Sequence, residues 1–301
     1  MTFIYLMKPN SFPGVGHRRR MPDPACLSFR FLRLGLLCAV FFVLTALGPG
    51  AAVADCIDPV ALWKLEESGA VPEYKDELNP GDHTGVCRTY NEVAVCPEPE
   101  AARDGIGQRF YAGEQPSGID IPSSAVFNWS ATDSFSISFW MKRDNTPLED
   151  NEVIVGRDST ESGNDLHWWI GVQQSGVARA VFITRQKTPS YENRHLKADK
   201  RLTDNQWHFI VFVRNGATSE SRLYVDGLLE DKVFITYADD DGFDADTTAM
   251  NIGWISLDPI YQYKGMVDEI ALYDTALPPW FIHDRYHAGV RYASGQADPC
   301  E

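Results

Sequence analysis

The sequence predicts an all-β fold, an antiparallel sandwich of two sheets with one short C-terminal helix. Short apolar segments recur at regular spacing, turn signals separate them, and helical periodicity is confined to the C-terminal end. This combination is typical of β-sandwiches. The clearest unit is residues 203–229, where two strand patterns flank Asn215-Gly216 and Asp226-Gly227 follows them. Asp-Gly can supply the two positive φ angles of a type I′ hairpin turn.

The remaining elements follow in chain order. The first strand is predicted over residues 60–65, and residues 66–105, which contain several Pro and Gly, are expected to be irregular. Runs of large apolar and β-branched residues favour strands. The helix is predicted over residues 278–288, because Pro278-Pro279 suits a first helical turn. Further strands are predicted near residues 117–121, 134–142, 152–156, 167–174, 177–186, 206–214, 221–226, 229–236, 250–256 and 265–274.

Residues 1–54 have the organisation of a secretory signal peptide. Arginines precede an apolar run from Leu34 to Leu47, and Ala52-Val53-Ala54 matches the small-residue cleavage pattern. Met21 is an alternative start. The apolar run is short for a membrane-spanning helix, so we expect cleavage and no stable membrane span afterwards; an uncleaved anchor is the alternative. Residues 55–301 are expected to form a single domain that is secreted, periplasmic or at the cell surface.

Four cysteines remain after the leader: Cys56, Cys87, Cys96 and Cys300. An even number in an exported chain predicts two disulfides, and four cysteines allow three connectivities. We favour Cys56–Cys300, because the termini of compact domains often lie close together, and Cys87–Cys96, which closes a short loop. Free buried thiols are the alternative.

The charge of the mature chain excludes one class of partner. The leader holds six Lys/Arg and one acid, so the remainder has 21 basic and 41 acidic residues and a formal charge of −20. Phosphate backbones attract the opposite sign, so nucleic acid is not an expected partner. Cations and neutral sugars are compatible with this charge, which also favours solubility.

Four sequence blocks together span roughly residues 57–290. They are Gly107–Phe110 with Gly118–Pro122, Phe135–Lys142, Trp207-His208 with Leu223–Gly227, and Gly265–Tyr273 with Ala276-Leu277. In this order the blocks resemble those of the laminin-G-like, concanavalin-A-like lectin-glucanase domains. The resemblance implies a two-sheet antiparallel jelly roll, and it says little about chemistry, because such folds host many functions.

Two acidic features are candidate calcium sites. The resemblance implies that Asp268, in the last block, helps to hold a structural calcium with backbone carbonyls from the N-terminal region; a strand residue that faces solvent or caps a turn is the alternative. The second feature is the Asp-rich loop 239–246, which can offer several oxygen ligands; a solvated surface loop is the alternative and the more common role of such a charge run. Its candidate ligands are Asp239, Asp241, Asp244 and Asp246.

Aromatic residues are the candidate ligand-binding set. Consecutive strand residues point to opposite faces, so of Trp168 and Trp169 one is expected in the core and the other partly exposed, where an indole can stack on a sugar ring. Trp254, Tyr261 and Tyr263 are predicted to line the same face or an adjoining loop. Core packing is the alternative for most of them.

The motifs do not favour catalysis. The E-x-D-x-x-E pattern of jelly-roll glycosidases and the G-x-S-x-G pattern of nucleophile elbows are both absent. His283 and His287 have the spacing that presents two imidazoles to a metal, but no third ligand is evident and a plain surface helix is the alternative. We therefore expect a non-catalytic module that binds a glycan or an extracellular protein, with calcium in a supporting role. A polysaccharide lyase or hydrolase and an adhesion or envelope-structural protein are the alternatives.

Overall fold

The computed structural model describes residues 57–292 except for residues 160–165, 185–194, 239–241, 244–246 and 257–260. The chain divides into two units, Met1–Ala52 and Val53–Glu301, and the first of these lies outside the described residues. The predicted signal peptide, Cys56, Cys300 and all four candidate ligands of the Asp-rich loop therefore also lie outside them.

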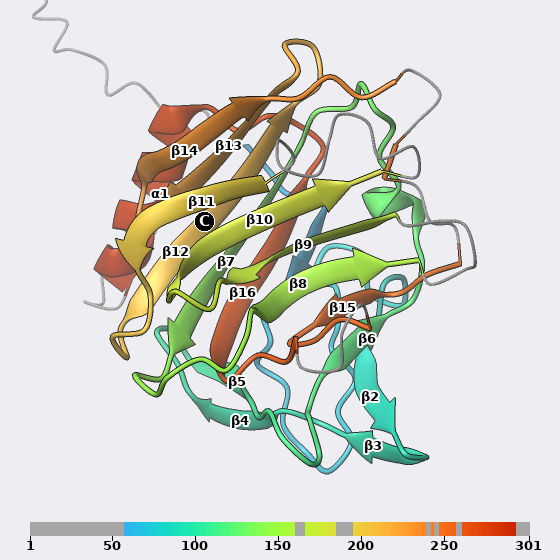
Figure 1. The fold of residues 1–301 in the computed structure, drawn as a ribbon. Helices are drawn as coiled ribbons and strands as arrows, with labels where there is room; N and C mark the ends of the chain where they lie inside the picture. The colour runs from blue at the N-terminus through green and yellow to red at the C-terminus, as the bar shows by residue number, and fades with distance from the viewer. Residues whose placement is uncertain are drawn as a thin grey trace, which may run out of the picture. The chain divides into compact units, whose positions relative to one another are not determined.

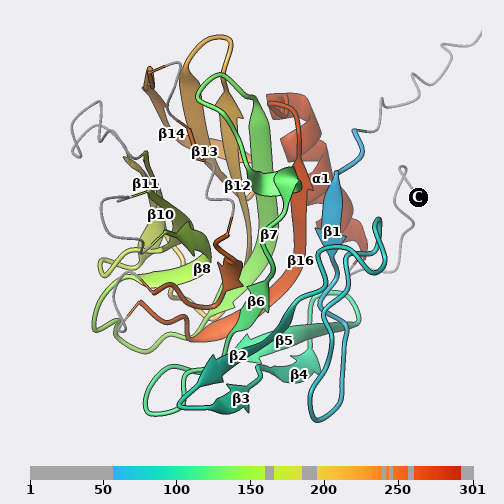
Figure 2. The same cartoon turned by 90° about the vertical axis from the view of Figure 1, so that its right-hand side faces the viewer.

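Two eight-stranded antiparallel sheets form the described unit, which confirms the predicted fold class (Figures 1 and 2). We call them the back sheet and the front sheet. The back sheet has the order β14 (Leu228–Phe234), β13 (Glu220–Val225), β12 (Trp207–Asn215), β7 (Phe135–Arg143), β16 (Gly265–Tyr273), β5 (Ile106–Phe110) and β4 (Glu98–Ala101), with β1 (Ala61–Trp63) also paired to β16.

The front sheet lies nearer the viewer in Figure 1. Its order mixes early and late strands, so distant parts of the chain meet within it. The strands are β11 (His195–Arg201), β10 (Val177–Ile183), β9 (His167–Val172), β8 (Glu152–Asp158), β15 (Met250–Ile252), β6 (Ile119–Ile121), β2 (Val86–Tyr90) and β3 (Val93–Val95).

The predicted hairpin is present between β13 and β14. Val225 pairs with Leu228, which leaves Asp226 and Gly227 as a two-residue loop. Their φ angles are 52° and 78°, the positive values that a type I′ turn requires. The Asp226-Gly227 signal therefore sets the register of this hairpin.

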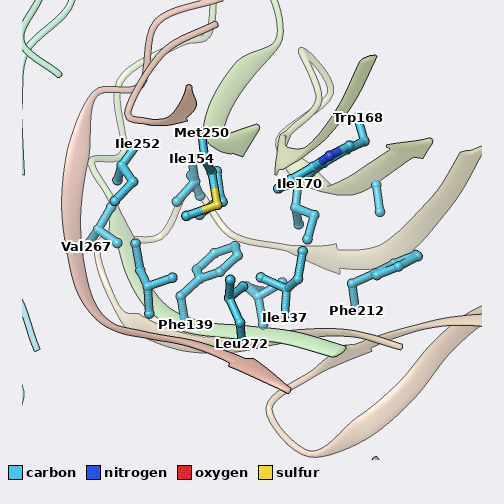
Figure 3. Close-up of a cluster of buried hydrophobic side chains, with 14 of the residues drawn as sticks. Ile137, Phe139, Ile154, Trp168, Ile170, Phe212, Met250, Ile252, Val267 and Leu272 are labelled. Carbon is cyan, nitrogen blue, oxygen red and sulfur yellow. The ribbon is translucent and has the colours of Figure 1, made fainter. Parts of the chain in front are cut away.

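The core between the sheets is filled by alternate side chains of facing strands (Figure 3). Aromatic rings dominate one end of it: Trp168 stacks on Phe182 at 5.6 Å between ring centroids, and Phe182 stacks on Phe212 at 4.0 Å. Offset stacks of this kind add stability beyond the area that the rings bury. The two sheets are thus held together by apolar burial.

Helix α1 (Pro279–Tyr292) packs on the outer face of the back sheet, close to the predicted position. Phe281 and Ile282 are buried against an apolar cluster that includes Trp140 and Phe209. The central strands of the back sheet are therefore apolar on both faces, which explains why residues 209–213 form a continuous apolar run instead of an alternating one.

The prediction that residues 66–105 are irregular was wrong from residue 86 onwards. That part contains β2, β3 and β4, and the strand predictions also missed β5 and β11. Asn91 and Glu92 both have positive φ and close a two-residue hairpin between β2 and β3. The same hairpin carries the disulfide between Cys87 and Cys96, the short-loop pairing favoured from the sequence. β11 has mostly polar residues because it is an edge strand with one exposed side.

Candidate functional site

The structure places two of the five predicted aromatic residues in the core. Trp168 and Tyr263 are fully buried, so neither can line a ligand-binding face as predicted. Figure 3 shows Trp168 inside the sandwich. The Tyr263 hydroxyl donates to the backbone oxygen of Met266 at 3.2 Å, and burial raises its pKa well above the ordinary value. Core packing explains both residues.

Trp169 does point to the outer face of the front sheet, as alternation requires, but it is not exposed. It is 2% exposed and packs in a small cluster with Val181 and Ile183. Tyr261 meets it edge to face at 6.1 Å, and the Tyr261 hydroxyl accepts from the Asn151 amide at 3.1 Å. The predicted exposed indole platform is therefore wrong for Trp169, because Tyr261 and neighbouring aliphatic side chains cover it.

Trp254 belongs to a different arrangement, a polar stack on the outer face of β2, β6 and β15. Its indole N–H donates to the Asp120 carboxylate at 2.8 Å. The Arg88 guanidinium lies 3.7 Å from the Trp254 ring centroid and 5.3 Å from that of Tyr90. A Cβ added at Gly118 would lie 2.4 Å from the indole, so glycine is needed for this close approach. Tyr90, at one end of this stack, is also a lining residue of a pocket.

This pocket, which we call the end pocket, has a volume of about 720 Å³. Its lining includes the last residue of β7, the first residue of β8, the residue before β16 and the last residue of β2. Volumes of this size are typical of small-ligand sites. The lining residues are Tyr90, Ala112, Gly113, Arg143, Thr146, Pro147, Glu149, Asp150, Glu152, Gln262 and Lys264.

A buried ion pair supports one wall of the end pocket. Arg143 is 1% exposed and binds Glu152 with two hydrogen bonds, Nε to Oε2 at 2.6 Å and Nη2 to Oε1 at 2.7 Å. Its Nη1 donates to the backbone oxygen of Asp144 and to the Thr146 hydroxyl. Burial raises the pKa of Glu152, although Arg143 opposes the shift. Both Glu152 oxygens are occupied, so this carboxylate positions the wall and is not free to transfer a proton.

The other polar groups of the end pocket are more accessible. Asp150, Gln262 and Lys264 are half-buried and Glu149 is exposed. The Gln262 side-chain oxygen accepts from the Gly113 backbone N–H at 3.2 Å, which orients the amide nitrogen for a further acceptor. Besides the Arg143–Glu152 pair, the lining has two acidic groups and one basic group. Such a site suits a polar ligand of low charge.

Sequence reasoning missed Tyr90, Arg143 and Gln262. Arg143 had a usable signal, since it ends an apolar strand nine residues before Glu152 and a short connection can bring the two together. Tyr90 and Gln262 lie far apart in the chain and had no such signal. Their proximity depends on the front sheet placing β2 and β15 on either side of β6.

Asp268 lies in a second, smaller cavity of about 70 Å³ beside the back sheet. It is 1% exposed, and its Oδ2 atom has no hydrogen-bond partner. Burial raises the pKa of Asp268 to about 8, and the negative charges of Glu269 and Glu66 add to the shift. Arg103, which bonds Glu269 at 3.0 Å, partly offsets it. The alternative of a solvent-facing strand residue is therefore excluded for Asp268.

The described residues hold no group of three or more His, Cys, Asp or Glu side chains arranged to bind a metal ion. Any site at Asp268 would accordingly rely on one or two carboxylates together with backbone oxygens, as the resemblance implies. The Asp-rich loop cannot be compared with this arrangement, since its four candidate ligands lie outside the described residues.

Comparison with solved structures finds the same fold in several proteins of known structure. The binding domain of Paraclostridial Mosquitocidal Protein 1 matches 75% of this chain with a TM-score of 0.55 and 16% identity, and the match covers 51% of that domain. Domain 4 of an extracellular arabinanase from Geobacillus stearothermophilus, in complex with arabinotriose, matches 75% of this chain and 97% of that domain, with a TM-score of 0.54 and 16% identity.

The botulinum neurotoxin serotype D ligand binding domain, in complex with N-acetylneuraminic acid, has a TM-score of 0.52 and 15% identity, with coverage of 76% of this chain and 50% of that one. This chain spans about half the length of the toxin domains that it matches. At these identities the likeness establishes the fold alone.

A search of curated protein sequences finds no match. A family model, described as the concanavalin A-like lectin/glucanases superfamily, matches residues 114–282. This range is more than half of the chain, and it contains most strands of both sheets. The chain therefore belongs to the concanavalin A-like lectin/glucanases superfamily.

Proposed function

We propose that this chain is an exported binding module and that its ligand is a glycan held in the end pocket. The observation that carries the proposal is the pocket itself, which combines an aromatic wall at Tyr90 with fixed amide, carboxylate and ammonium groups of nearly balanced charge. Glycans need this combination, because a sugar ring offers both C–H surfaces and hydroxyl groups. The formal charge of −20 after the leader disfavours polyanionic ligands.

The fold relatives support a binding role. Solved relatives include a domain in complex with arabinotriose, one with N-acetylneuraminic acid and one with rat synaptotagmin II. A glycan is favoured over a protein partner here, because a concave polar pocket suits a small polar ligand better than a flat protein surface. Export rests on the leader pattern of residues 1–54. No helix among the described residues is long and apolar enough to cross a membrane.

Binding is favoured over catalysis at this pocket. Glycoside hydrolysis needs two carboxyl groups on either side of the scissile bond. Glu152 is committed to Arg143, and one oxygen of Asp150 accepts from the Asn151 backbone N–H at 2.7 Å. The pocket thus presents no pair of free, opposed carboxylates.

The proposal is tested on a glycan array, followed by calorimetric titration of the best glycan. Tyr90→Ala should weaken binding at least about tenfold, equivalent to about 1.4 kcal/mol, and Gln262→Ala should also weaken it. Phe234→Ala removes an exposed aromatic of β14 that is not part of the pocket and should leave binding unchanged. The proposal would be overturned if Tyr90→Ala bound the glycan as tightly as Phe234→Ala does, or if the protein depolymerised the bound glycan.

We further propose a structural calcium ion at Asp268. One observation supports the ion: calcium prefers oxygen ligands, and Asp268 Oδ2 is a buried oxygen without a hydrogen-bond partner in a cavity that Glu66 also lines. The ion would give this carboxylate a positively charged partner and would connect β16 to the N-terminal segment.

Calcium at 100 times its dissociation constant should stabilise the folded protein by about 2.7 kcal/mol, visible as a rise in Tm. Asp268→Asn should abolish that rise. Glu98→Gln serves as the control, since Glu98 lies on exposed β4 outside this cavity, and it should keep the full rise. An unchanged Tm with calcium in the parent protein, or a rise in the Asp268→Asn variant equal to that of the parent, would refute the site.

A further inference from the structure

The exposed face of helix α1 carries two imidazoles that converge. His283 and His287 lie one turn apart, both are exposed, and their Nε2 atoms are 3.0 Å apart. The ring centroids are separated by 4.2 Å. Neither the end pocket nor the cavity at Asp268 uses these side chains, and the fold does not require them, because both point away from the buried face of the helix.

We propose that His283 and His287 form a binding site for a divalent transition metal ion, with Cu²⁺ bound most tightly and Zn²⁺ less so. Imidazole nitrogen is a preferred ligand of both ions, and Cu²⁺ stands above Zn²⁺ in the general affinity order. A metal–nitrogen bond is about 2.0–2.1 Å. If the nitrogen–metal–nitrogen angle lies between a right angle and the tetrahedral angle, the two nitrogens are about 2.8–3.4 Å apart. The observed distance of 3.0 Å between the two Nε2 atoms falls within that interval.

A neighbouring carboxylate orients one of the two ligands. The Asp284 Oδ1 atom lies 3.3 Å from His283 Nδ1, so it can accept the Nδ1–H hydrogen bond. This places the lone pair of His283 on Nε2, the atom that faces His287. Carboxylate partners of this kind fix the tautomer of metal-binding histidines and raise their basicity. In the metal-free form His287 Nε2–H donates to His283; metal binding moves that proton to Nδ1, so the step releases no net proton.

The helix holds the pair in place before a metal arrives. Phe281 and Ile282 are buried against the back sheet, and the Tyr286 ring stacks on Trp140 at 5.8 Å. The β13–β14 turn also contacts the helix, since a Cβ added at Gly227 would lie 3.3 Å from the His283 Cα atom. A preorganised pair loses less conformational entropy on binding than two free side chains.

The pair would leave part of the coordination sphere open. Among the described residues no third His, Cys, Asp or Glu joins it, so two protein ligands would leave positions for water. This arrangement differs from a closed structural zinc site, which uses four protein ligands. Metal binding here should therefore be reversible and should not be needed for folding.

The test uses the full mature chain without a polyhistidine tag. Cu²⁺ is titrated by calorimetry at neutral pH, and the bound ion is examined by electron paramagnetic resonance. We expect one ion whose spectrum shows coupling to two imidazole nitrogens. His283→Ala and His287→Ala should each weaken Cu²⁺ binding at least about tenfold. Asp284→Asn should weaken it about tenfold, which is the smallest effect usual for the loss of a residue that orients a metal ligand.

Trp280→Ala is the matched control, because Trp280 is an exposed residue of the same helix without a metal-binding atom; it should bind Cu²⁺ as the parent does. Circular dichroism checks that each variant keeps its fold. The proposal is overturned if the His283→Ala, His287→Ala double variant retains the parent affinity and spectrum, or if the parent binds no Cu²⁺.

Discussion

A single buried carboxylate, Asp226, ties the β13–β14 turn to the adjacent strands, and its replacement by asparagine is the most informative perturbation. Asp226 is 7% exposed and accepts from the Phe209 backbone N–H at 2.9 Å and, through its other oxygen, from His208 Nδ1 at 2.8 Å. Lys200 Nζ lies 2.5 Å from the oxygen that His208 contacts. Asparagine keeps the shape and tolerates the positive φ of this position, so the main change is the loss of charge.

Removing one partner of a buried charged pair costs about 3–5 kcal/mol. Asparagine retains an oxygen acceptor for Phe209, so we expect the lower value, about 3 kcal/mol. The Lys200 side chain is 43% exposed and adds little, because solvent screens exposed pairs. For a domain of this size about 3 kcal/mol corresponds to a fall in Tm of roughly 6–12 °C.

The loss should depend on pH, with a sign set by the two pKa shifts. Burial alone would lower the pKa of His208, but Asp226 and Asp204 outweigh it and leave the pKa raised. Its contribution is therefore present below the unfolded pKa of about 6.5 and is lost as the pH rises through the folded value. Burial would raise the pKa of Asp226, but hydrogen bonds from His208, Lys200 and Phe209 leave it lowered. Its contribution is present above about pH 3.9 and is lost as the pH falls through the folded value.

The difference between parent and Asp226→Asn should thus be largest near pH 5.5 and smaller at pH 9, measured by urea unfolding with tryptophan fluorescence. Asp204→Asn is the matched control, since Asp204 contacts the other His208 nitrogen at 3.1 Å but its side chain is 46% exposed. It should cost about 0–1 kcal/mol. An equal loss at both pH values, or a loss no larger than that of Asp204→Asn, would refute the reasoning.

Two further predictions concern stability. Cys87 and Cys96 are nine positions apart, and replacing both by alanine removes the bond that closes this loop. The free energy of unfolding should fall by about 2.5 kcal/mol, measured as a lower urea midpoint. A midpoint equal to that of the parent would show that the β2–β3 hairpin closes without the bond. Trp168→Ala removes a fully buried ring and should cost about 3–5 kcal/mol, whereas Trp280→Ala, at 47% exposure, should stay within about 0.5 kcal/mol. Similar losses for the two tryptophans would contradict the assignment of Trp168 to the core.

The sequence alone was sufficient for the class of fold, since local signals decide it. Asp226-Gly227 specifies a two-residue hairpin through backbone φ angles, and the apolar runs of β7, β12 and β16 specify strands through side-chain shape and burial. The pairing of Cys87 with Cys96 followed from their short separation. Each of these signals acts between residues close in the chain, where few alternatives compete.

Only the tertiary structure decided which faces are covered and which residues meet. Alternation sends Trp168 and Trp169 to opposite faces, but whether the outer face is exposed depends on what covers it, and Tyr261 is 92 positions further along the chain. Tyr90, Arg143 and Gln262 likewise form one pocket because strand order brings their loops together. Strand order results from burial summed over both sheets, a non-local quantity that no single segment of sequence carries.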